Sequence, residues 1–441
     1  MSPPPAAEAR KRAVILVGNP ANPYSRAIRI GRTLVDEGYD VEIAATVEHG
    51  APLEEHDGPL LIRRYPPSGI FASMAATYRW APPPATPAKR PPLATRVLRT
   101  LRARFISWFL WPHTVRGWWR TLSRELPPAD LYHSCGTLPI AAAVAARKRD
   151  ARTGRRSKVI LDVIDITMES NNVLGIPPLI RRMVSRREAG WARQADAYSA
   201  VNDAFADKAQ ARWHLADRPT VVPNYPEPWS PPAAGAPAVD RIRETTGLPS
   251  TTRICLFWGR LGPYVGLDEA AEAVLLVPDT ALVVLGFGRG WERSLARDRD
   301  PRYVGRHFSL PAVHPDELAS WVASADVALC TLPPLSYNQR YTLPNKFLEA
   351  MTAGTPIVLG PDLPGMETVL RQEDLGRVAV SMQPADIAAA IRSILELPAE
   401  ERDAWRRRIQ ATARERYSWP IAAEWYARLV RGLQGSQDPT P

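Results

Sequence analysis

A polar stripe at the start of a helical segment is the first place where the sequence offers chemistry. Residues 341–358 read YTLPNKFLEAMTAGTPIV, in which Thr342, Asn345 and Glu349 fall at i, i+3 and i+7 and share one helix face. Pro344 suits the first helical position, which predicts a cap at one of the two residues before it. Free N–H groups at a helix start attract anions, so the stripe indicates an anionic or hydroxylated ligand. A capped surface helix with a solvated face explains the pattern equally well.

Further candidates follow apolar runs of the amino-terminal half. His133, in DLYHSCG, ends a predicted strand beside small residues, where a histidine serves either structure or chemistry. Asp162, Asp165 and Glu169 close the run VILDVIDITME, where a carboxylate either acts on an acceptor hydroxyl or caps the next segment. We expect Asp165 to be the best placed of the three. No His, Cys or Asp cluster has metal-ligand spacing, so no metal is expected.

In the carboxy-terminal half, a cation and several glycines follow strands. Gly259 and Arg260 come at the end of the run ICLFWG, and a guanidinium there suits phosphate oxygens. Gly286 and Gly288 in GFGRG either let the backbone approach a nucleotide or end a buried strand in a tight turn. The sequence favours neither interpretation.

Length and composition predict a two-domain cytoplasmic protein. The 441 residues exceed the size of one hydrophobic core, and 45 prolines cluster in segments that separate structured parts. A net charge of +10 fits an anionic small molecule, an acidic membrane or a nucleic acid. Cys135, Cys255 and Cys330 lack C-x-x-C spacing and are expected to be reduced thiols. No apolar run reaches 18 residues, so no membrane span is expected. No apolar signal core precedes the first predicted strand, so secretion is not expected either.

Strands and helices alternate twice along the chain, which predicts two parallel sheets with helices on both faces. We expect an α/β fold of two Rossmann-like, doubly wound domains facing a central cleft, where ligands of open sheets bind. The predicted units are 1–228 (with 1–11 a flexible tail), 238–418, and a closing helix at 419–434 that returns to the first domain. The strands predicted for the second domain include ALVVLGFG, YVG (303–305) and PIVLG.

These motifs together carry a family resemblance. WGRLGPYVGLDEAAEA, VVLGFGRG, ASADVALCTL, YTLPNKFLEAMTAGTPIVLG and RERYSWPIAAEWYARLV, in this order, resemble the GT-B glycosyltransferases of family 4, in the branch that reads LPNK. DLYHSCGTLP and TVVPNYPE extend the resemblance to the amino-terminal half. It covers about residues 12–434, and the more specific motifs lie in the carboxy-terminal half.

The resemblance implies a nucleotide-diphosphate-sugar donor in the second domain. Gly259 and Arg260 would approach the diphosphate, and Glu349 would hold the ribose hydroxyls. The family's usual lysine falls on Val265 and its first acid on Tyr341, so half of the usual cationic clamp and the sugar-gripping acid are missing. Lys346 is the candidate substitute for the lysine. The remaining donor-side candidates are the helix start Leu343, Pro344 and Asn345, with Gly286 and Gly288.

On the acceptor side, the resemblance places His133 near the reacting sugar and leaves Asp165 for the acceptor hydroxyl. Asn22 and Arg26, in the loop predicted after the first strand, replace a frequent Gly-Gly. Side chains and helix dipoles, not Mg²⁺, would neutralise the diphosphate. The implied function is a retaining glycosyltransferase of cell-surface polysaccharide, glycolipid or secondary-metabolite synthesis. The alternatives are a nucleotide-sugar epimerase or hydrolase on the same fold, and an inactive GT-B-like partner of a membrane assembly.

A basic aromatic segment bears on partners. Residues 88–125 hold nine basic residues and one acid, and aromatic and aliphatic side chains repeat along them. Residues 93–119 therefore predict either an interfacial helix on an anionic membrane or an amphipathic helix packed on the first domain. The first option would place the protein at the inner face of the plasma membrane, with a lipid-linked acceptor. No nucleic-acid recognition module is present.

Overall fold

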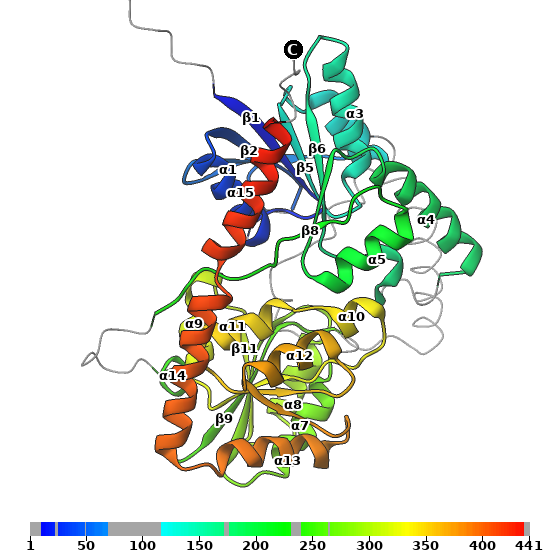
Figure 1. Ribbon diagram of the computed structural model, residues 1–441. Coiled ribbons are helices and arrows are strands. Elements are labelled where there is room, and N and C mark those ends of the chain that lie inside the picture. Colours follow the sequence, from blue (N-terminus) through cyan, green and yellow to red (C-terminus); the bar gives the residue numbers. More distant parts are fainter. Residues whose placement is uncertain are drawn as a thin grey trace, which may run out of the picture.

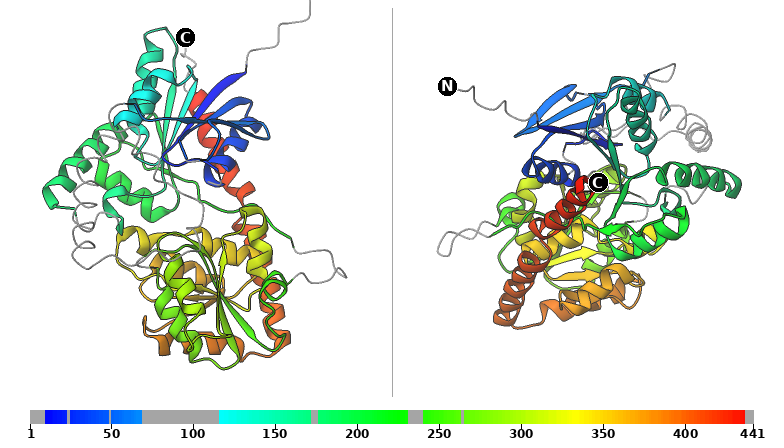
Figure 2. Two further views of the ribbon diagram at one scale, coloured as in Figure 1. Left: turned by 180° about the vertical axis from the view of Figure 1, so that it is seen from behind. Right: turned by 45° about the horizontal axis from the view of Figure 1, so that its top comes forward.

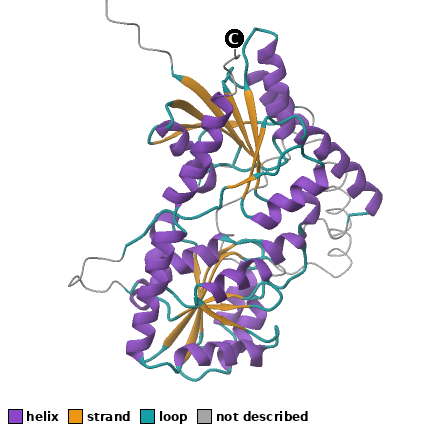
Figure 3. Cartoon of the chain, in the orientation of Figure 1, coloured by secondary structure: helices purple, strands orange, loops and turns teal. Residues whose placement is uncertain are grey.

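The chain folds into two parallel-sheet domains, seen one above the other in the computed structural model (Figure 1). The structure describes residues 10–22, 25–48, 50–68, 116–171, 176–230, 240–262 and 265–435. Helices lie on both faces of each sheet (Figure 3). Within these described ranges, no helix is long and apolar enough to cross a membrane.

The amino-terminal sheet has the strand order β3-β4-β2-β1-β5-β6-β7-β8, and only β3 runs antiparallel to its neighbour. Its central strands are mostly buried because both faces are covered; residues 13–17 of β1, for example, are fully buried. The edge hairpin of β3 and β4 was not expected from the sequence, because EEHD lacks an apolar pattern. The strands are β1 (Lys11–Val17), β2 (Tyr39–Thr46), β3 (Glu54–Asp57), β4 (Leu60–Tyr65), β5 (Leu131–Cys135), β6 (Lys158–Val163), β7 (Ala197–Ala200) and β8 (Thr220–Val221).

The helices of this domain pack on its sheet and carry the chain from strand to strand. A helix at residues 116–125 precedes β5, and α5 is capped by Asn202, whose side chain accepts from the Phe205 N–H. The other elements are α1 (Ser25–Asp36), α3 (Ile140–Ala151), the 3₁₀ turn η2 (Thr167–Glu169), α4 (Pro178–Ala192) and α5 (Asp203–Trp213).

The carboxy-terminal sheet is wholly parallel, in the order β11-β10-β9-β12-β13-β14. One predicted strand was wrong: residues 303–305 lie in a turn, and the strand begins at His307. The N–H groups of Arg306 and His307 both donate to the Tyr303 carbonyl, which closes that turn. The strands are β9 (Arg253–Arg260), β10 (Thr280–Phe287), β11 (His307–Pro311), β12 (Val327–Cys330), β13 (Ile357–Leu359) and β14 (Gly376–Val378).

Helices complete the second domain and lead back to the first. They are α6 (Arg241–Thr246), α7 (Leu267–Leu275), α8 (Trp291–Asp298), α9 (Pro315–Ala323), α10 (Tyr337–Tyr341), α11 (Asn345–Ala353), α12 (Pro364–Gln372), α13 (Pro384–Leu395), α14 (Ala399–Arg416) and α15 (Trp419–Gly435).

The last two helices run as one column from the second domain to the first (Figures 1 and 2). At the junction, the Trp419 N–H donates to the Pro226 carbonyl, and the Trp419 indole donates to Thr33 of α1 at 3.3 Å. Further along, Tyr426 is fully buried against β5. The closing helix is therefore part of the amino-terminal core.

Candidate functional site

The two domains meet through loops that follow the carboxyl ends of their strands. On one side lie the segments after β6, β7 and β8; on the other lie α10 and α11, which follow β12. We call this the interdomain face. Asparagine side chains join it: Asn338 Nδ2 to the Ile166 carbonyl (3.1 Å), Asn202 Nδ2 to the Tyr341 carbonyl (2.8 Å) and Asn224 Nδ2 to Asn345 Oδ1 (2.7 Å).

The start of α11 lies at this face, one residue later than the sequence predicted. Pro344 is the N-cap, with φ −70° and ψ 155°, and Asn345 is the first helical residue. The free N–H groups expected over 343–346 therefore begin at Asn345, because proline has none. Leu343 is half-buried and packs against the core. Phe347 and Met351 are fully buried, which leaves the opposite side of the helix for ligand contact.

Glu349 and Lys346 lie along β9. The Trp258 indole donates to Glu349 Oε2 at 2.7 Å, and Lys346 Nζ lies 4.3 Å from the centre of the Phe257 ring. Burial raises the pKa of Glu349, against the opposing effects of Trp258 and Lys346. Burial likewise lowers the pKa of Lys346. Both groups are thus held in poorly solvated surroundings, where charge on a ligand would interact strongly.

Arg260 is the last residue of β9, and its side chain is exposed. Gly259 before it has φ 97°, a conformation that only glycine adopts without strain. The two departures from the family pattern are also visible. Val265 packs against the core, and the Tyr341 ring lies 4.5 Å from that of Tyr337, so neither position supplies a charge.

The glycines of GFGRG have a packing explanation. A Cβ on Gly286 would lie 2.7 Å from the Leu261 side chain, and one on Gly288 would lie 3.0 Å from the Leu261 carbonyl oxygen. Gly288 also has φ 105°. Both residues therefore accommodate the loop that follows Arg260.

His133 does not reach the interdomain face, contrary to the role expected for it near the sugar. It is fully buried within β5, and its Nδ1 lies 2.9 Å from the Tyr426 hydroxyl oxygen. Its Nε2 lies 3.6 Å from Asp162 Oδ2. The imidazole therefore connects α15 to the sheet.

Asp162 and Arg26 are also internal. Arg26 belongs to α1 and not to a loop, and its Nε and one terminal nitrogen donate to the two oxygens of Asp162 at 2.7 Å. Ser199 donates to the same carboxylate at 2.8 Å. His133, Cys135 and Asp162 offer possible ligand atoms within 4.8 Å of one another. In this arrangement the Asp162 carboxylate is bound by Arg26 and Ser199 and belongs to a buried ion-pair network.

Asp165 is a carboxylate of the amino-terminal domain at the interdomain face. It lies two residues after β6, and its side chain is exposed, although protein surrounds it on enough sides to desolvate it and raise its pKa to about 6. The next residue, Ile166, is held from the other domain by Asn338. A carboxyl group with this pKa can take up a proton near neutral pH.

Sequence reasoning missed several residues of the interdomain face. Arg29 of α1 donates to Asn224 Oδ1 at 2.6 Å and lies near enough to Glu349 to lower its pKa. Asn338 and Trp258 were also missed. Asn224 stands in the quoted motif TVVPNYPE, but nothing in its local pattern indicates that it faces another domain.

The predicted basic aromatic segment lies mostly outside the described residues, which resume at 116. Within its described end, Trp118 is buried, and the Trp119 indole donates to the Leu138 carbonyl at 2.7 Å. The Trp119 ring packs edge-on against Trp191 of α4 at 5.0 Å. These two aromatic side chains therefore pack on the domain.

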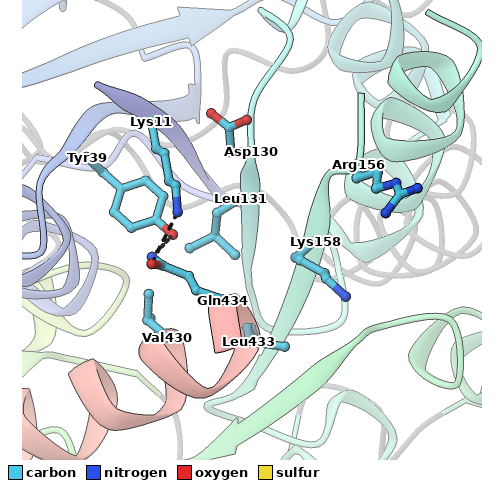
Figure 4. A pocket seen from close by; sticks show the side chains of 9 residues that line it. All are labelled: Lys11, Tyr39, Asp130, Leu131, Arg156, Lys158, Val430, Leu433 and Gln434. Atoms are coloured by element: carbon cyan, nitrogen blue, oxygen red, sulfur yellow. Dashed lines mark hydrogen bonds between the residues drawn. The ribbon is translucent and has the colours of Figure 1, made fainter. Parts of the chain in front are cut away.

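A small cavity of about 60 Å³ lies elsewhere (Figure 4). Its lining residues come from the amino ends of β1, β2, β5 and β6 and from the end of α15, and Lys11 donates to Gln434 across it. The cavity therefore lies at the amino ends of the strands, whereas the interdomain face lies at their carboxyl ends.

This arrangement of two facing parallel-sheet domains with a returning helix defines the GT-B class. Anabaena HepE, solved in complex with UDP, matches with a TM-score of 0.62 over 96% of this chain and all of that chain, at 12% identity. The family model described as glycosyl transferases group 1 matches residues 238–412. This match lies within the carboxy-terminal domain and covers less than half of the chain.

Curated relatives match part of the chain. D-inositol 3-phosphate glycosyltransferase 2 of Catenulispora acidiphila is 28% identical over 207 residues, which are 44% of this chain and 47% of the relative. D-inositol 3-phosphate glycosyltransferase of Geodermatophilus obscurus is 31% identical over 166 residues, 35% of each chain. The chain thus spans less than half the length of these relatives.

Proposed function

We propose that the protein is a retaining glycosyltransferase that moves a sugar from a nucleotide-diphosphate-sugar to a hydroxyl acceptor. The observation that carries the proposal is the geometry around β9. Arg260 ends this strand, while Lys346 and Glu349 of α11 contact the two residues before Gly259. Cations and free N–H groups would bind the diphosphate, and the carboxylate of Glu349 would accept from ribose hydroxyls.

In this proposal the amino-terminal domain supplies the acceptor side. The bond between the anomeric carbon and the leaving phosphate oxygen breaks, and the leaving group keeps the electron pair. The acceptor oxygen bonds to the same face of the sugar, and its proton passes to Asp165. Arg260, Lys346 and the start of α11 would stabilise the charge that develops on the diphosphate. No metal or other cofactor is part of the proposal.

The names of similar proteins support the donor class. A solved neighbour of the same fold is HepE with UDP-glucose, and the curated relatives are named as glycosyltransferases acting on an inositol phosphate. We extend only the shared chemistry, a nucleotide-linked sugar and a hydroxyl acceptor, to this chain. Polysaccharide, glycolipid or secondary-metabolite synthesis at the cytoplasmic side of the membrane would use such a reaction.

The test is turnover with a panel of nucleotide-sugars, ranked first by the rise in melting temperature that each produces. Release of the nucleoside diphosphate should require an acceptor, and NMR of the product should show the donor's anomeric configuration. Arg260→Ala should lower turnover about 30- to 1000-fold, about 2–4 kcal/mol. Arg371→Ala, which removes an exposed arginine paired with Glu367, is the matched control and should be neutral.

One observation favours a second candidate, a binding protein without turnover. Val265 and Tyr341 occupy the positions where the resemblance implied a lysine and an acid, and neither carries charge into the site. Saturable nucleotide-sugar binding without any release of nucleoside diphosphate would establish this alternative. Release of free sugar without an acceptor would instead indicate a hydrolase.

A further inference from the structure

Helix α4 lies at the outer edge of the amino-terminal domain (Figures 1 and 2), and it carries exposed apolar side chains. Leu179 is 71% exposed, Met183 52% and Ile180 39%. Leu179 and Met183 are one turn apart, with Ile180 beside them, so the three share the outward side of the helix. The inward side is formed by Glu188, Ala189 and Ala192, which are buried.

Arginines flank these apolar side chains. Arg182, Arg186 and Arg187 are exposed on the same outward half of α4. Within the described part of the chain, no carboxylate forms an ion pair with any of the three. The one acid of the helix, Glu188, points inward and contacts Thr137. The outward face therefore combines uncovered apolar area with unneutralised positive charge.

We propose that this outward face of α4 docks on an anionic lipid surface. Apolar side chains in the first two turns would enter the boundary between headgroups and acyl chains, while the guanidinium groups would bind lipid phosphates. A protein partner would need an apolar groove with acids along both of its sides. An anionic bilayer offers apolar acyl chains and negatively charged headgroups at every point of its surface. The chain's net charge of +10 adds further attraction to an anionic surface.

The position of α4 links this surface to the interdomain face. Arg181 of α4 donates to the Met168 carbonyl of η2 at 2.8 Å, three residues after Asp165. Glu188 contacts the loop after β5 through Thr137. Docking through α4 would therefore hold the acceptor-side loops near the lipid headgroups. This last consequence rests on the proposed function, but the docking itself does not.

The experiment is co-sedimentation of the full chain with vesicles, either of phosphatidylcholine alone or with 30 mol% phosphatidylglycerol. Wild type should bind the anionic vesicles, and added salt should weaken binding because it screens the charges. Leu179→Ser/Met183→Ser and Arg186→Gln/Arg187→Gln should each lower the partition coefficient at least tenfold. All four side chains are exposed, so the melting temperature should stay within about 2 °C.

The matched control is Arg407→Gln/Arg414→Gln on α14, which removes the same charge from two exposed arginines in the other domain. It should change binding less than twofold. Equal losses in the control and in the α4 arginine variant would show general charge attraction and overturn the proposal. Wild-type behaviour of both α4 variants would assign any binding to another segment. A dimer that Leu179→Ser/Met183→Ser converts to monomer, without vesicle binding, would assign the face to a second copy of the chain.

Discussion

The ion pair of Arg26 and Asp162 allows a prediction worked directly from the structure. Both side chains are completely buried, and two hydrogen bonds of 2.7 Å join them. Arg26→Met would leave a carboxylate without its cation inside the core, which costs about 3–5 kcal/mol. At about 2–4 °C per kcal/mol, the amino-terminal domain should melt about 6–20 °C lower at pH 7.

The matched control lies on the same helix. Arg32 of α1 pairs with Asp57 at 3.2 Å, but its side chain is 49% exposed, so Arg32→Met should cost about 0–1 kcal/mol. The double variant Arg26→Met/Asp162→Asn should recover part of the loss, because it removes the unpaired charge. Calorimetry or circular dichroism measures all three. Equal melting temperatures for Arg26→Met and Arg32→Met would refute the reasoning.

The pH dependence gives an independent check. Burial alone would raise the pKa of Asp162, but the charge and hydrogen bonds of Arg26 outweigh it and hold the pKa well below its usual range. This stabilisation is present above the ordinary pKa of about 4 and is lost as the pH falls below it. In Arg26→Met, burial would raise the pKa, so the carboxyl would take a proton on acidification. The difference in melting temperature should therefore shrink from pH 7 to pH 4.

Three further predictions concern single side chains. Glu349→Gln should weaken donor binding. A donor that lacks the 2′ and 3′ hydroxyls should bind poorly to wild type, and Glu349→Gln should weaken its binding little further. If titration calorimetry shows that the two losses of binding free energy add up, Glu349 does not contact the ribose. Asp165→Asn should remove the fall in activity below pH 6. Because the folded-state pKa is raised above the ordinary value of about 4, stability is lost as the pH rises from about 4 through about 6. This variant should therefore also melt higher than wild type at pH 7.5, and the difference should nearly vanish by about pH 3.5. Tyr426→Phe removes one buried hydrogen bond to His133, so the melting temperature should fall by about 1–6 °C with donor binding unchanged; weakened donor binding at an unchanged melting temperature would contradict this.

Periodicity predicted most elements, because buried parallel strands and their helices leave a strong apolar pattern. Phe347 and Met351 were expected in the core from their spacing alone, and they are buried. The edge strand β3 was missed, since an exposed edge needs no apolar residues. The turn around Tyr303 was mistaken for a strand because its buried aromatic ring resembles strand composition.

The site was harder to predict because it depends on which residues the two domains bring together. The sequence pattern around a histidine that follows an apolar run is the same whether its ring faces a ligand or another helix. Only the return of α15 shows that Tyr426 takes the space beside His133. Likewise, Asp162 and Asp165 stand three residues apart on one strand end, yet one is neutralised by Arg26 and the other is exposed.

Tyr341 makes contacts within α10 and between the domains at a position where the resemblance implied an acid. Where the resemblance implied a sugar-binding acid, the tyrosine ring packs on Tyr337 and its carbonyl accepts from Asn202 of the other domain. The neighbouring Asn338 binds both backbone groups of Ile166, beside Asp165. Helix α10 thus contributes to the interdomain face by holding the segments after β6 and β7. The two hydrogen bonds of Asn338 therefore fix the backbone next to Asp165, while that of the Tyr341 carbonyl joins α10 to the segment after β7.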